Sequence, residues 1–547
     1  KQFWIKTSER WQLCTDMVKR KGPQGVVVRS TPPQEFDESA TSVRKKKKRA
    51  KHAPGASGTE PQEAVDGVTE TLSSAGDVIE AEAGVDPPVC PGIGGPPSKL
   101  LDWLVWPLTS TTFLETYWEK RPVHIRRKRP GFWGELFSKA VVDEQLRGKA
   151  PPKYGERINL ARFDTATGRK VSLNKEGAAC WEEVDSAWAN GASIQVMHPQ
   201  QFHQPVFRLL LGLERSFGAL CGANSYITPG SCQGLAPHFD DVEVFMMQLE
   251  GSKRWRLHEP PSGEEFPVPR DYSRDFMPDE LESLLLDSVI DSGDLLYVPR
   301  GVVHQGVACS SGFSHHLTVS TYQKTAWCNV LDRALSGAVE RAASTCEEFR
   351  SGLPVGFLKY MGSWCDSGVA NGEEAEKRGL FESHFRDLLR RLDDFVDLDE
   401  VCDELGVDFM ARRLPNGPEA DEAATGKGVV VTHPVAAQDC VRWRDPSHMR
   451  LMVSDDPETK EPTVMIFHSG NNNSAQHMSS EGEPEEDVGC LRFEAATFMP
   501  ALRILCCAPG AVCVDSLPLR HEEDRVALCE ELNAAGLLLV EHAEKKP

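Results

Sequence analysis

The stretch GANSYITPGSCQGLAPHFDDVEVFMMQLEGSKRWRLHEP, residues 222–260, sets a His-Phe-Asp triplet among short apolar segments. Gly and Pro interrupt the chain repeatedly as far as residue 322, and the segments between them are rich in apolar and β-branched residues. Short strands separated by turn residues are typical of an all-β sandwich or barrel. This part of the chain is therefore predicted to be mainly β.

The triplet supplies two candidate metal ligands, His238 and Asp240. At the start of a strand they would share one face, because side chains alternate along a strand. A third candidate, His304, ends the segment GDLLYVPRGVVH, residues 293–304. Its Gly and Pro residues favour a strand, a tight turn and a return strand, with His304 at the end of a β-hairpin.

Two histidines and one carboxylate form the facial triad of non-haem Fe(II) oxygenases, whose open positions suit a bidentate 2-oxo acid and O₂. An HxD pair alone is common by chance, and any one of the 16 histidines is more often structural or at the surface. The HxD pair together with the spaced Gly, Pro, Gly and His304 is much more specific. His315 and His316, near the same sheet, are interpreted as structural.

Segments on either side of this region have their own periodicity. Aromatic spacing predicts a helix that buries Phe113, Tyr117 and Trp118, with Thr111 or Thr112 as its cap. Strands are predicted at residues 122–125, 157–163, 193–197, 428–431 and 463–467. Helices are predicted at residues 205–217, 330–342, 384–395, 400–411 and 522–535.

The net charge of −21 is unevenly distributed. Residues 1–52 hold 14 Lys/Arg and 5 Asp/Glu. The basic run 44–51 is typical of a nuclear localisation signal or of a segment that contacts nucleic acid. An alternative of similar weight is that these charges lie in a disordered segment and are only solvated. Residues 53–97 hold 8 acids and no base and are rich in Pro and Gly, so we expect residues 1–97 to form a disordered tail.

Two polar inserts, 416–427 and 469–487, are predicted to be surface loops, and the second ends in an acidic cluster. The 16 cysteines include no C-x-x-C pair, which argues against a zinc finger and favours reduced thiols in an intracellular protein. No run of 18 or more apolar residues occurs, so no membrane partner is expected.

Four stretches of the chain closely resemble the JmjC ribosomal oxygenases: residues 222–260, 296–327, 101–137 and 408–415. The resemblance implies a mainly β double-stranded β-helix, JmjC/cupin-like, at residues 98–326. It also implies an α-helical dimerisation domain at 327–413, a C-terminal winged-helix domain at 414–547, and a homodimer. The basic arm looks like that of the nucleolar member of the family, which implies a location in the nucleus and the nucleolus.

Carried over to this chain, the resemblance makes His238, Asp240 and His304 the Fe(II) ligands and catalytic centre. It places 2-oxoglutarate against Asn224, Tyr226, Lys253 and Ser320. Lys253 can set an ammonium against the distal carboxylate of the cosubstrate, although a lone lysine on a hairpin is usually at the surface. The choice of Ser320 stays open, because Thr318 and Thr321 lie beside it. Asp241 is interpreted as structural or exposed, and Glu243 as a strand-surface acid.

The expected activity is that of a 2-oxoglutarate-dependent dioxygenase that hydroxylates a histidine of a large-subunit ribosomal protein. A JmjC histone lysine demethylase is the alternative of the same class, with a histone as partner. An alternative of another class is a chromatin- or ribosome-associated binding module without turnover. Direct DNA binding by the C-terminal domain is not expected, because residues 411–547 hold 13 bases and 23 acids.

Overall fold

The computed structural model describes residues 76–82, 84–90, 97–260, 268–366, 372–415, 434–456, 459–479 and 488–542. All elements below belong to one compact unit, Ser74–Asp456 with Lys460–Pro547. The basic run 44–51, the insert 416–427 and the strand predicted at 428–431 lie outside the described residues. Within the described ranges, no helix has both the length and the apolar character needed to cross a membrane.

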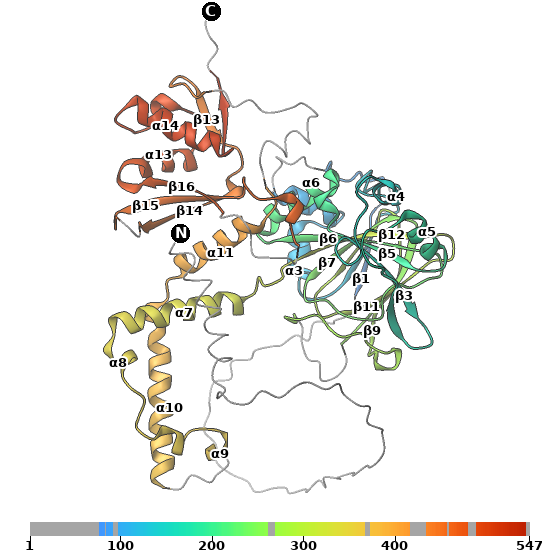
Figure 1. Cartoon of the computed structure of the whole chain (residues 1–547), viewed down its shortest axis with the longest axis horizontal. Coiled ribbons are helices and arrows are strands. Elements are labelled where there is room, and N and C mark those ends of the chain that lie inside the picture. Colours follow the sequence, from blue (N-terminus) through green and yellow to red (C-terminus); the bar gives the residue numbers. More distant parts are fainter. Residues whose placement is uncertain are drawn as a thin grey trace, which may run out of the picture. The chain divides into compact units, whose positions relative to one another are not determined.

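A nine-stranded sheet forms the larger layer of the β domain, with the strand order β1-β2-β10-β7-β12-β6-β5-β3-β4. Figure 1 labels β1, β3, β5, β6, β7 and β12 of this sheet. β2, β3 and β5 confirm the strands predicted at 122–125, 157–163 and 193–197. The strands of this sheet are β1 (Asp77–Glu80), β2 (Val123–Arg126), β3 (Ile158–Asp164), β4 (Arg169–Ser172), β5 (Ser193–Met197), β6 (Cys221–Thr228), β7 (Glu243–Glu250), β10 (Leu295–Val298) and β12 (Ser314–Thr321).

A smaller sheet, of order β11-β8-β9, packs against the inner face of the larger one. Its strands are β8 (Ser252–His258), β9 (Leu284–Asp291) and β11 (Val303–Ala308). Apolar side chains of both sheets meet in one buried cluster: Val244, Met246, Leu296 and Val298 from the larger sheet, and Trp255, Leu257, Leu286 and Ile290 from the smaller. The prediction of an all-β sandwich or barrel is confirmed for the described residues between 224 and 322.

Helices bury the outer face of the larger sheet. They are α2 (Pro97–Val105), α3 (Ser110–Thr116), α4 (Lys139–Arg147), α5 (Trp181–Ala189) and α6 (Gln204–Phe217). Phe113 and Leu210 pack in one core with Phe245 of β7. α6 confirms the helix predicted at 205–217. The cap predicted for α3 is wrong: Thr109, not Thr111 or Thr112, accepts a hydrogen bond from the backbone N–H of Thr112.

Strand β1 corrects the prediction that order begins near residue 98. It pairs in parallel with β2, and Tyr117 donates a hydrogen bond to Asp77 at 2.9 Å. Glu80 forms ion pairs with Arg126 and Lys128. A four-residue edge strand needs little apolar burial of its own, because backbone hydrogen bonds and these ion pairs attach it. Average composition therefore could not reveal it.

The described residues 327–366 and 372–412 are mainly helical, as predicted. The helices are α7 (Trp327–Thr345), α8 (Glu347–Arg350), α9 (Ser363–Asp366), α10 (Glu373–Arg391) and α11 (Leu398–Arg412). α10 begins 11 residues before the predicted position 384. α7 buries only small side chains, at Ala334, Ala338 and Ala342, two of which pack against Leu392.

The C-terminal part contains two three-stranded sheets, β17-β13-β18 and β14-β15-β16. They share a core with two helices, and β15 and α14 confirm the strand predicted at 463–467 and the helix at 522–535. The elements are β13 (Cys440–Trp443), β14 (Met449–Asp455), β15 (Pro462–His468), β16 (Gly489–Glu494), α13 (Ala495–Cys507), β17 (Val512–Cys513), α14 (Glu522–Ala534) and β18 (Leu538–Glu541).

The described part of the insert 469–487 is not a free surface loop. His477 is buried, and its Nε2 lies 2.8 Å from the carboxylate of Glu214 on α6. The other ring nitrogen lies 3.1 Å from the side-chain nitrogen of Gln200. The prediction for this segment is therefore wrong at His477, because a polar sequence can still supply a buried hydrogen-bonding group.

Candidate metal centre

His238 and Asp240 lie in the loop between β6 and β7, because β7 begins only at Glu243. His238 forms an isolated β-bridge with His304, in which each backbone N–H donates to the carbonyl of the other residue, at 3.3 and 2.8 Å. The N–H of Gly301 donates to the carbonyl of Asp240 at 3.1 Å. The prediction that strand alternation aligns the HxD pair is wrong, and these backbone contacts position the pair instead.

His304 is on β11, but not in a β-hairpin with β10. β10 lies between β2 and β7 in the larger sheet, whereas β11 pairs with β8 in the smaller. The turn that contains Gly301, whose φ is 89°, carries the chain from one sheet to the other. The predicted hairpin is therefore wrong. The crossing between sheets brings His304 opposite the loop that holds His238.

The three side chains converge on one point. Their potential ligand atoms all lie within 4.8 Å of one another, and no other such group occurs in the described ranges. The carboxylate of Asp240 is 3.8 Å from Nε2 of His238 and 3.7 Å from Nε2 of His304. His304 is buried, whereas the side chain of Asp240 is 33% exposed. The site therefore opens on the side of Asp240.

Backbone carbonyls fix the orientation of both imidazoles. Nδ1 of His238 lies 2.8 Å from the carbonyl of Ala236, and Nδ1 of His304 lies 3.1 Å from that of Val302. Because a carbonyl only accepts, each Nδ1 carries the proton and each Nε2 presents a lone pair to the site. Burial and the nearby His238 lower the pKa of His304 to about 4, so it is neutral near pH 7, as metal binding requires.

Lys253 supplies a buried positive charge beside this centre. Its ammonium lies 4.7 Å from the ring centroid of Trp255, and the residue is 5% exposed. Burial lowers the pKa of Lys253 to about 7, and no acidic partner lies beside it in the described part of the chain. Gly306 leaves the space that Lys253 occupies, since a Cβ there would lie 2.7 Å from its Cε. A carboxylate ligand would supply the missing counter-charge.

Asn224 and Tyr226 are two residues apart on β6 and so point to the same face. The Tyr226 hydroxyl accepts a hydrogen bond from Gln195 at 3.1 Å. Burial, and then the nearby Asp240, raise the pKa of Tyr226, so it remains a hydroxyl. The side-chain oxygen of Asn224 is buried without a hydrogen-bond partner among the described atoms.

His316 belongs to this pocket, although its sequence position suggested a structural role. Its ring stacks on Tyr226 with centroids 5.1 Å apart, and it meets Trp255 edge-on at 5.3 Å. Its Nδ1 is buried and unpartnered among the described atoms. Burial and then the charge of Lys253 hold its pKa well below the ordinary value. The alternation of β12, which places residue 316 on the face of residue 320, could have revealed it.

His315 points to the other face and is structural, as predicted. It contacts Ser225 at 2.7 Å and Glu250 at 2.6 Å.

The three hydroxyl residues near the end of β12, Thr318, Ser320 and Thr321, occupy different positions relative to β6. Thr318 is in register with Asn224, whereas Ser320 is in register with Gly222. A Cβ at Gly222 would lie 3.3 Å from the Ser320 hydroxyl and 3.2 Å from Met478. Thr321 points away and donates to the carbonyl of Leu220. Thr318 therefore lies beside Asn224, and Ser320 lies two residues further along the strand.

Glu243 corrects a second prediction. It is fully buried and accepts a hydrogen bond from Tyr297, with Arg300 3.4 Å away. Burial raises the pKa of Glu243 to about 7. Asp241 is partly exposed and accepts a hydrogen bond from Gln323 at 3.1 Å, consistent with the predicted structural role.

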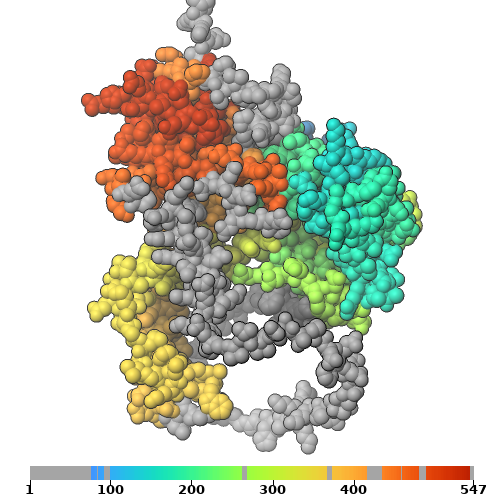
Figure 2. Space-filling view, in the orientation of Figure 1, coloured from blue at the N-terminus to red at the C-terminus, as the bar shows by residue number. Residues whose placement is uncertain are grey.

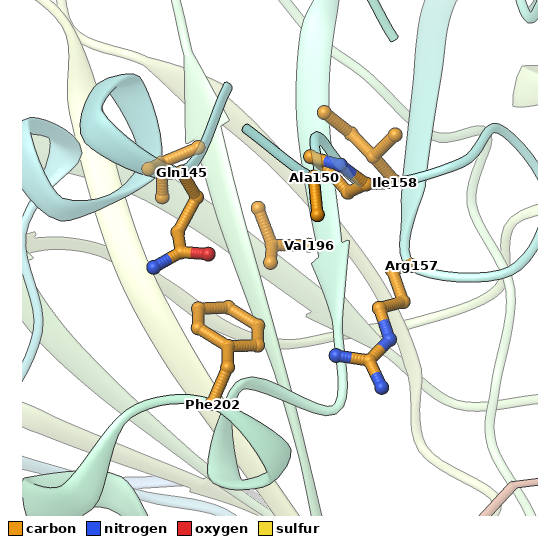
Figure 3. A pocket seen from close by; sticks show the side chains of 8 residues that line it. Gln145, Ala150, Arg157, Ile158, Val196 and Phe202 are labelled. Carbon is orange, nitrogen blue, oxygen red and sulfur yellow. The ribbon is translucent and has the colours of Figure 1, made fainter. Parts of the chain in front are cut away.

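A small hollow elsewhere in the β domain has a volume of about 40 Å³ (Figure 3). It is lined by Val142, Gln145, Ala150, Pro152, Arg157, Ile158, Val196 and Phe202. Such a space holds one or two water molecules, so it does not compete with the metal centre as a substrate site.

Two imidazoles and one carboxylate on a β scaffold have the donor set of the non-haem Fe(II) oxygenases. Buried Lys253, which has no acidic partner beside it in the described part of the chain, fits an anionic cosubstrate such as 2-oxoglutarate. The class that this fold and site define is therefore a metal- and 2-oxo-acid-dependent oxygenase.

Comparison with known proteins agrees with that class. The JmjC domain family matches residues 195–327. Ribosomal oxygenase 1 of Danio rerio is 32% identical, covering 81% of this chain and 79% of its own length. Ribosomal oxygenase 1 of Homo sapiens is 31% identical, covering 81% and 67%. The chain belongs to the JmjC ribosomal oxygenases, a family of 2-oxoglutarate- and metal-dependent dioxygenases.

Two further similarities are more distant. A Dictyostelium discoideum protein named bifunctional lysine-specific demethylase and histidyl-hydroxylase NO66 is 28% identical, covering 81% of this chain and 82% of its own length. The solved structure of YcfD from Escherichia coli covers 79% of this chain and 98% of that protein, at 17% identity and a TM-score of 0.41.

Proposed function

We propose that this chain is an Fe(II)- and 2-oxoglutarate-dependent protein hydroxylase whose substrate is a histidine of a large-subunit ribosomal protein. The observation that carries the proposal is the convergence of His238, Asp240 and His304 beside buried Lys253. The names of the relatives support the ribosomal substrate and the histidyl reaction.

The metal would be held by Nε2 of His238, Nε2 of His304 and the carboxylate of Asp240. Bound Fe(II) would supply the chemistry that couples decarboxylation of 2-oxoglutarate, with O₂, to oxidation of an unactivated C–H bond. The carbonyls of Ala236 and Val302 keep each Nε2 directed at the site. Their role is to orient the ligands, because an imidazole that turned over would present a proton instead of a lone pair.

Lys253 would bind the distal carboxylate of the cosubstrate, and Tyr226 would donate a hydrogen bond to it. Asn224 would hold the end of the cosubstrate nearer the metal. Ser320 keeps its predicted role in this pocket, although Thr318 lies nearer Asn224 in the strand register. The part-exposed edge at Asp240 and His238 leaves one side open for a protein substrate.

A histone lysine demethylase is the second candidate, because the name of the Dictyostelium relative includes that activity. Both reactions begin at a C–H bond and use the same metal ligands, so the products separate them. A hydroxylated histidine peptide gains one oxygen atom, whereas a demethylated lysine peptide loses a methyl group as formaldehyde.

The helical segment 327–413 is proposed as a dimerisation domain for a homodimer. Apolar side chains recur every fourth residue of α7 and leave a stripe exposed along one face. Figure 2 shows α7 and the residues that follow it in yellow. Exposed apolar patches of this kind mark protein interfaces, and a homodimer is the commonest assembly that would bury one. The stripe consists of Trp327 (83% exposed), Leu331 (55%), Leu335 (41%) and Val339 (49%).

The basic run 44–51 is proposed as the localisation signal for the nucleus and nucleolus. Residues 414–547, proposed as a winged helix, carry an excess of acids, so they are expected to contact protein rather than DNA. Replacing Lys45, Lys46, Lys47 and Lys48 by alanine in a fluorescent fusion should move the protein out of the nucleus. Retained nuclear fluorescence would reject this localisation signal.

The test of the proposed function is a turnover assay with Fe(II), 2-oxoglutarate and histidine-containing peptides of large-subunit ribosomal proteins. Succinate release together with addition of one oxygen to a histidine is expected. Methyl loss from histone peptides without histidine oxidation would favour the demethylase. No turnover with either peptide set would favour a binding module without activity.

A further inference from the structure

Two cysteines of the C-terminal part face each other across paired strands. Cys440 of β13 is directly opposite Cys513 of β17 in the antiparallel register. Both are free thiols of intermediate exposure, and the two side chains are in hydrogen-bonding contact. Among the strand pairs that the structure describes, no other register sets one cysteine against another: Cys221 faces Thr321 and Cys490 faces Phe467.

Cys440 and Cys513 form a non-hydrogen-bonded pair of the antiparallel ladder, the kind of pair in which facing side chains lie closest. The N–H of Val514 donates to the carbonyl of Asp439 at 2.9 Å, which marks residues 439 and 514 as the hydrogen-bonded pair. The next pair, Cys440 and Cys513, is then the non-hydrogen-bonded one, with its Cα atoms about 4.5 Å apart. That separation falls within the range that a disulfide spans.

We propose that Cys440 and Cys513 form a reversible oxidation site, whose oxidant is a peroxide or a low-molecular-weight disulfide and whose product is a cross-strand disulfide. With a peroxide, the sulfur of one cysteine attacks the O–O bond and becomes a sulfenic acid, releasing one water. The second sulfur attacks the sulfenic sulfur, the S–S bond forms and a second water leaves. The two thiols lose two electrons and two protons, and the peroxide gains them.

The surrounding structure gives the bond a local consequence. β17 has only two residues and lies at the edge of the sheet β17-β13-β18. Two register pairs join it to β13, supported by the N–H of Asp515, which donates to the carbonyl of Ala437 at 2.9 Å. A covalent bond at residues 440 and 513 would fasten this edge and close the chain between them into a loop.

The environment also predicts how the reaction depends on pH. Burial, and then the neighbouring Cys513, raise the pKa of Cys440 above its ordinary value. The thiolate is the reactive form, so oxidation should be slow near neutral pH and accelerate as the pH rises. The site is thus expected to respond to sustained oxidation rather than to a brief pulse.

The experiment uses the full chain, reduced and then incubated with a glutathione redox buffer or with hydrogen peroxide. Free thiols are alkylated, the protein is digested without reduction, and linked peptides are identified by mass spectrometry. We expect a peptide pair joined through Cys440 and Cys513, short of two hydrogen atoms, as the main linked product of the native protein, whereas the chain oxidised in urea should link its cysteines in many combinations. The same mixture of linked peptides in both, or continued alkylation of both thiols, would overturn the proposal.

Matched variants separate this site from the other thiols. Cys440→Ser and Cys513→Ser should each abolish the linked peptide and leave the partner thiol open to alkylation. Cys506→Ser, which changes an exposed thiol on α13, should leave the link unchanged. The oxidised wild-type protein should also unfold at a higher temperature than the reduced one, and Cys440→Ser should remove that difference. A link that persists in Cys440→Ser would assign the oxidation to another pair.

Discussion

The β domain and the helical segment distribute polar and apolar side chains in opposite ways. Between the two sheets, Lys253 and His316 are buried, and the Lys253 ammonium has no acidic partner beside it in the described part of the chain. The side-chain oxygen of Asn224 and Nδ1 of His316 are buried without a hydrogen-bond partner among the described atoms. Along α7, by contrast, Trp327 and Leu331 expose large apolar surfaces. Unpaired polar groups in an interior call for a small polar ligand, whereas an exposed apolar stripe calls for a protein surface. We therefore infer a small polar ligand for the β domain and a protein partner for the helical segment.

The metal ligands should give the largest effect on turnover. Replacing His238 by alanine removes one of three ligands, so activity should fall by more than the ~100-fold typical of losing an outer-sphere partner. The fold should remain, because His238 is not part of a main apolar cluster. Circular dichroism and succinate release measure the two effects. Activity close to wild type would show that this triad does not hold the metal.

The cosubstrate pocket should give the next effect. Lys253→Ala removes a charged hydrogen-bond donor, a loss of about 1.5–3 kcal/mol, so the KM for 2-oxoglutarate should rise roughly 10–100-fold. Arg254→Ala is the matched control, because this neighbour on β8 points outward to Asp287. An equal change in KM for both variants would remove Lys253 from the pocket.

The pH dependence sharpens the role of Lys253. Because its pKa is lowered to about 7, the ammonium loses its proton as the pH rises past that value. The kcat/KM for 2-oxoglutarate should therefore be full below about pH 7 and fall about tenfold per unit above it. Lys253→Arg should remove the fall, since a guanidinium stays charged. A flat wild-type profile would contradict a neutralised lysine.

The helical segment should give the smallest effect on turnover and a large effect on assembly. The double change Leu331→Glu and Leu335→Glu places charges in the exposed stripe and should convert a dimer into monomers in analytical ultracentrifugation. Turnover per chain should change little, since neither residue touches the metal centre. Ser336→Glu, also exposed on α7, is the control. A wild-type chain that sediments as a monomer would refute the homodimer.

The sequence predicted which candidate metal ligands lie together better than the way they are brought together. Spacing and residue type pointed to His238, Asp240 and His304, because metal binding restricts the donor atoms so strongly. The prediction of a β-hairpin ending at His304 was wrong because Gly and Pro indicate a turn but not the sheet to which the next strand belongs. Glu243 was misread as a strand-surface acid because a single sequence does not show what packs opposite a strand.

Long-range contacts explain the remaining differences. β1 and His477 lie in segments whose composition indicates disorder or a surface loop, yet each is attached by a partner distant in the chain: β2 for the strand and Glu214 for the histidine. Helices such as α6 were predicted well because their periodicity is local.

Mass spectrometry of a ribosomal-protein histidine peptide after incubation with the enzyme, Fe(II), 2-oxoglutarate and O₂ tests the proposed hydroxylase activity most directly. We expect one added oxygen on histidine in proportion to the succinate released, and neither product with Asp240→Ala. Histidine peptides that stay unmodified with the wild-type enzyme, or that are oxidised equally by Asp240→Ala, would contradict it.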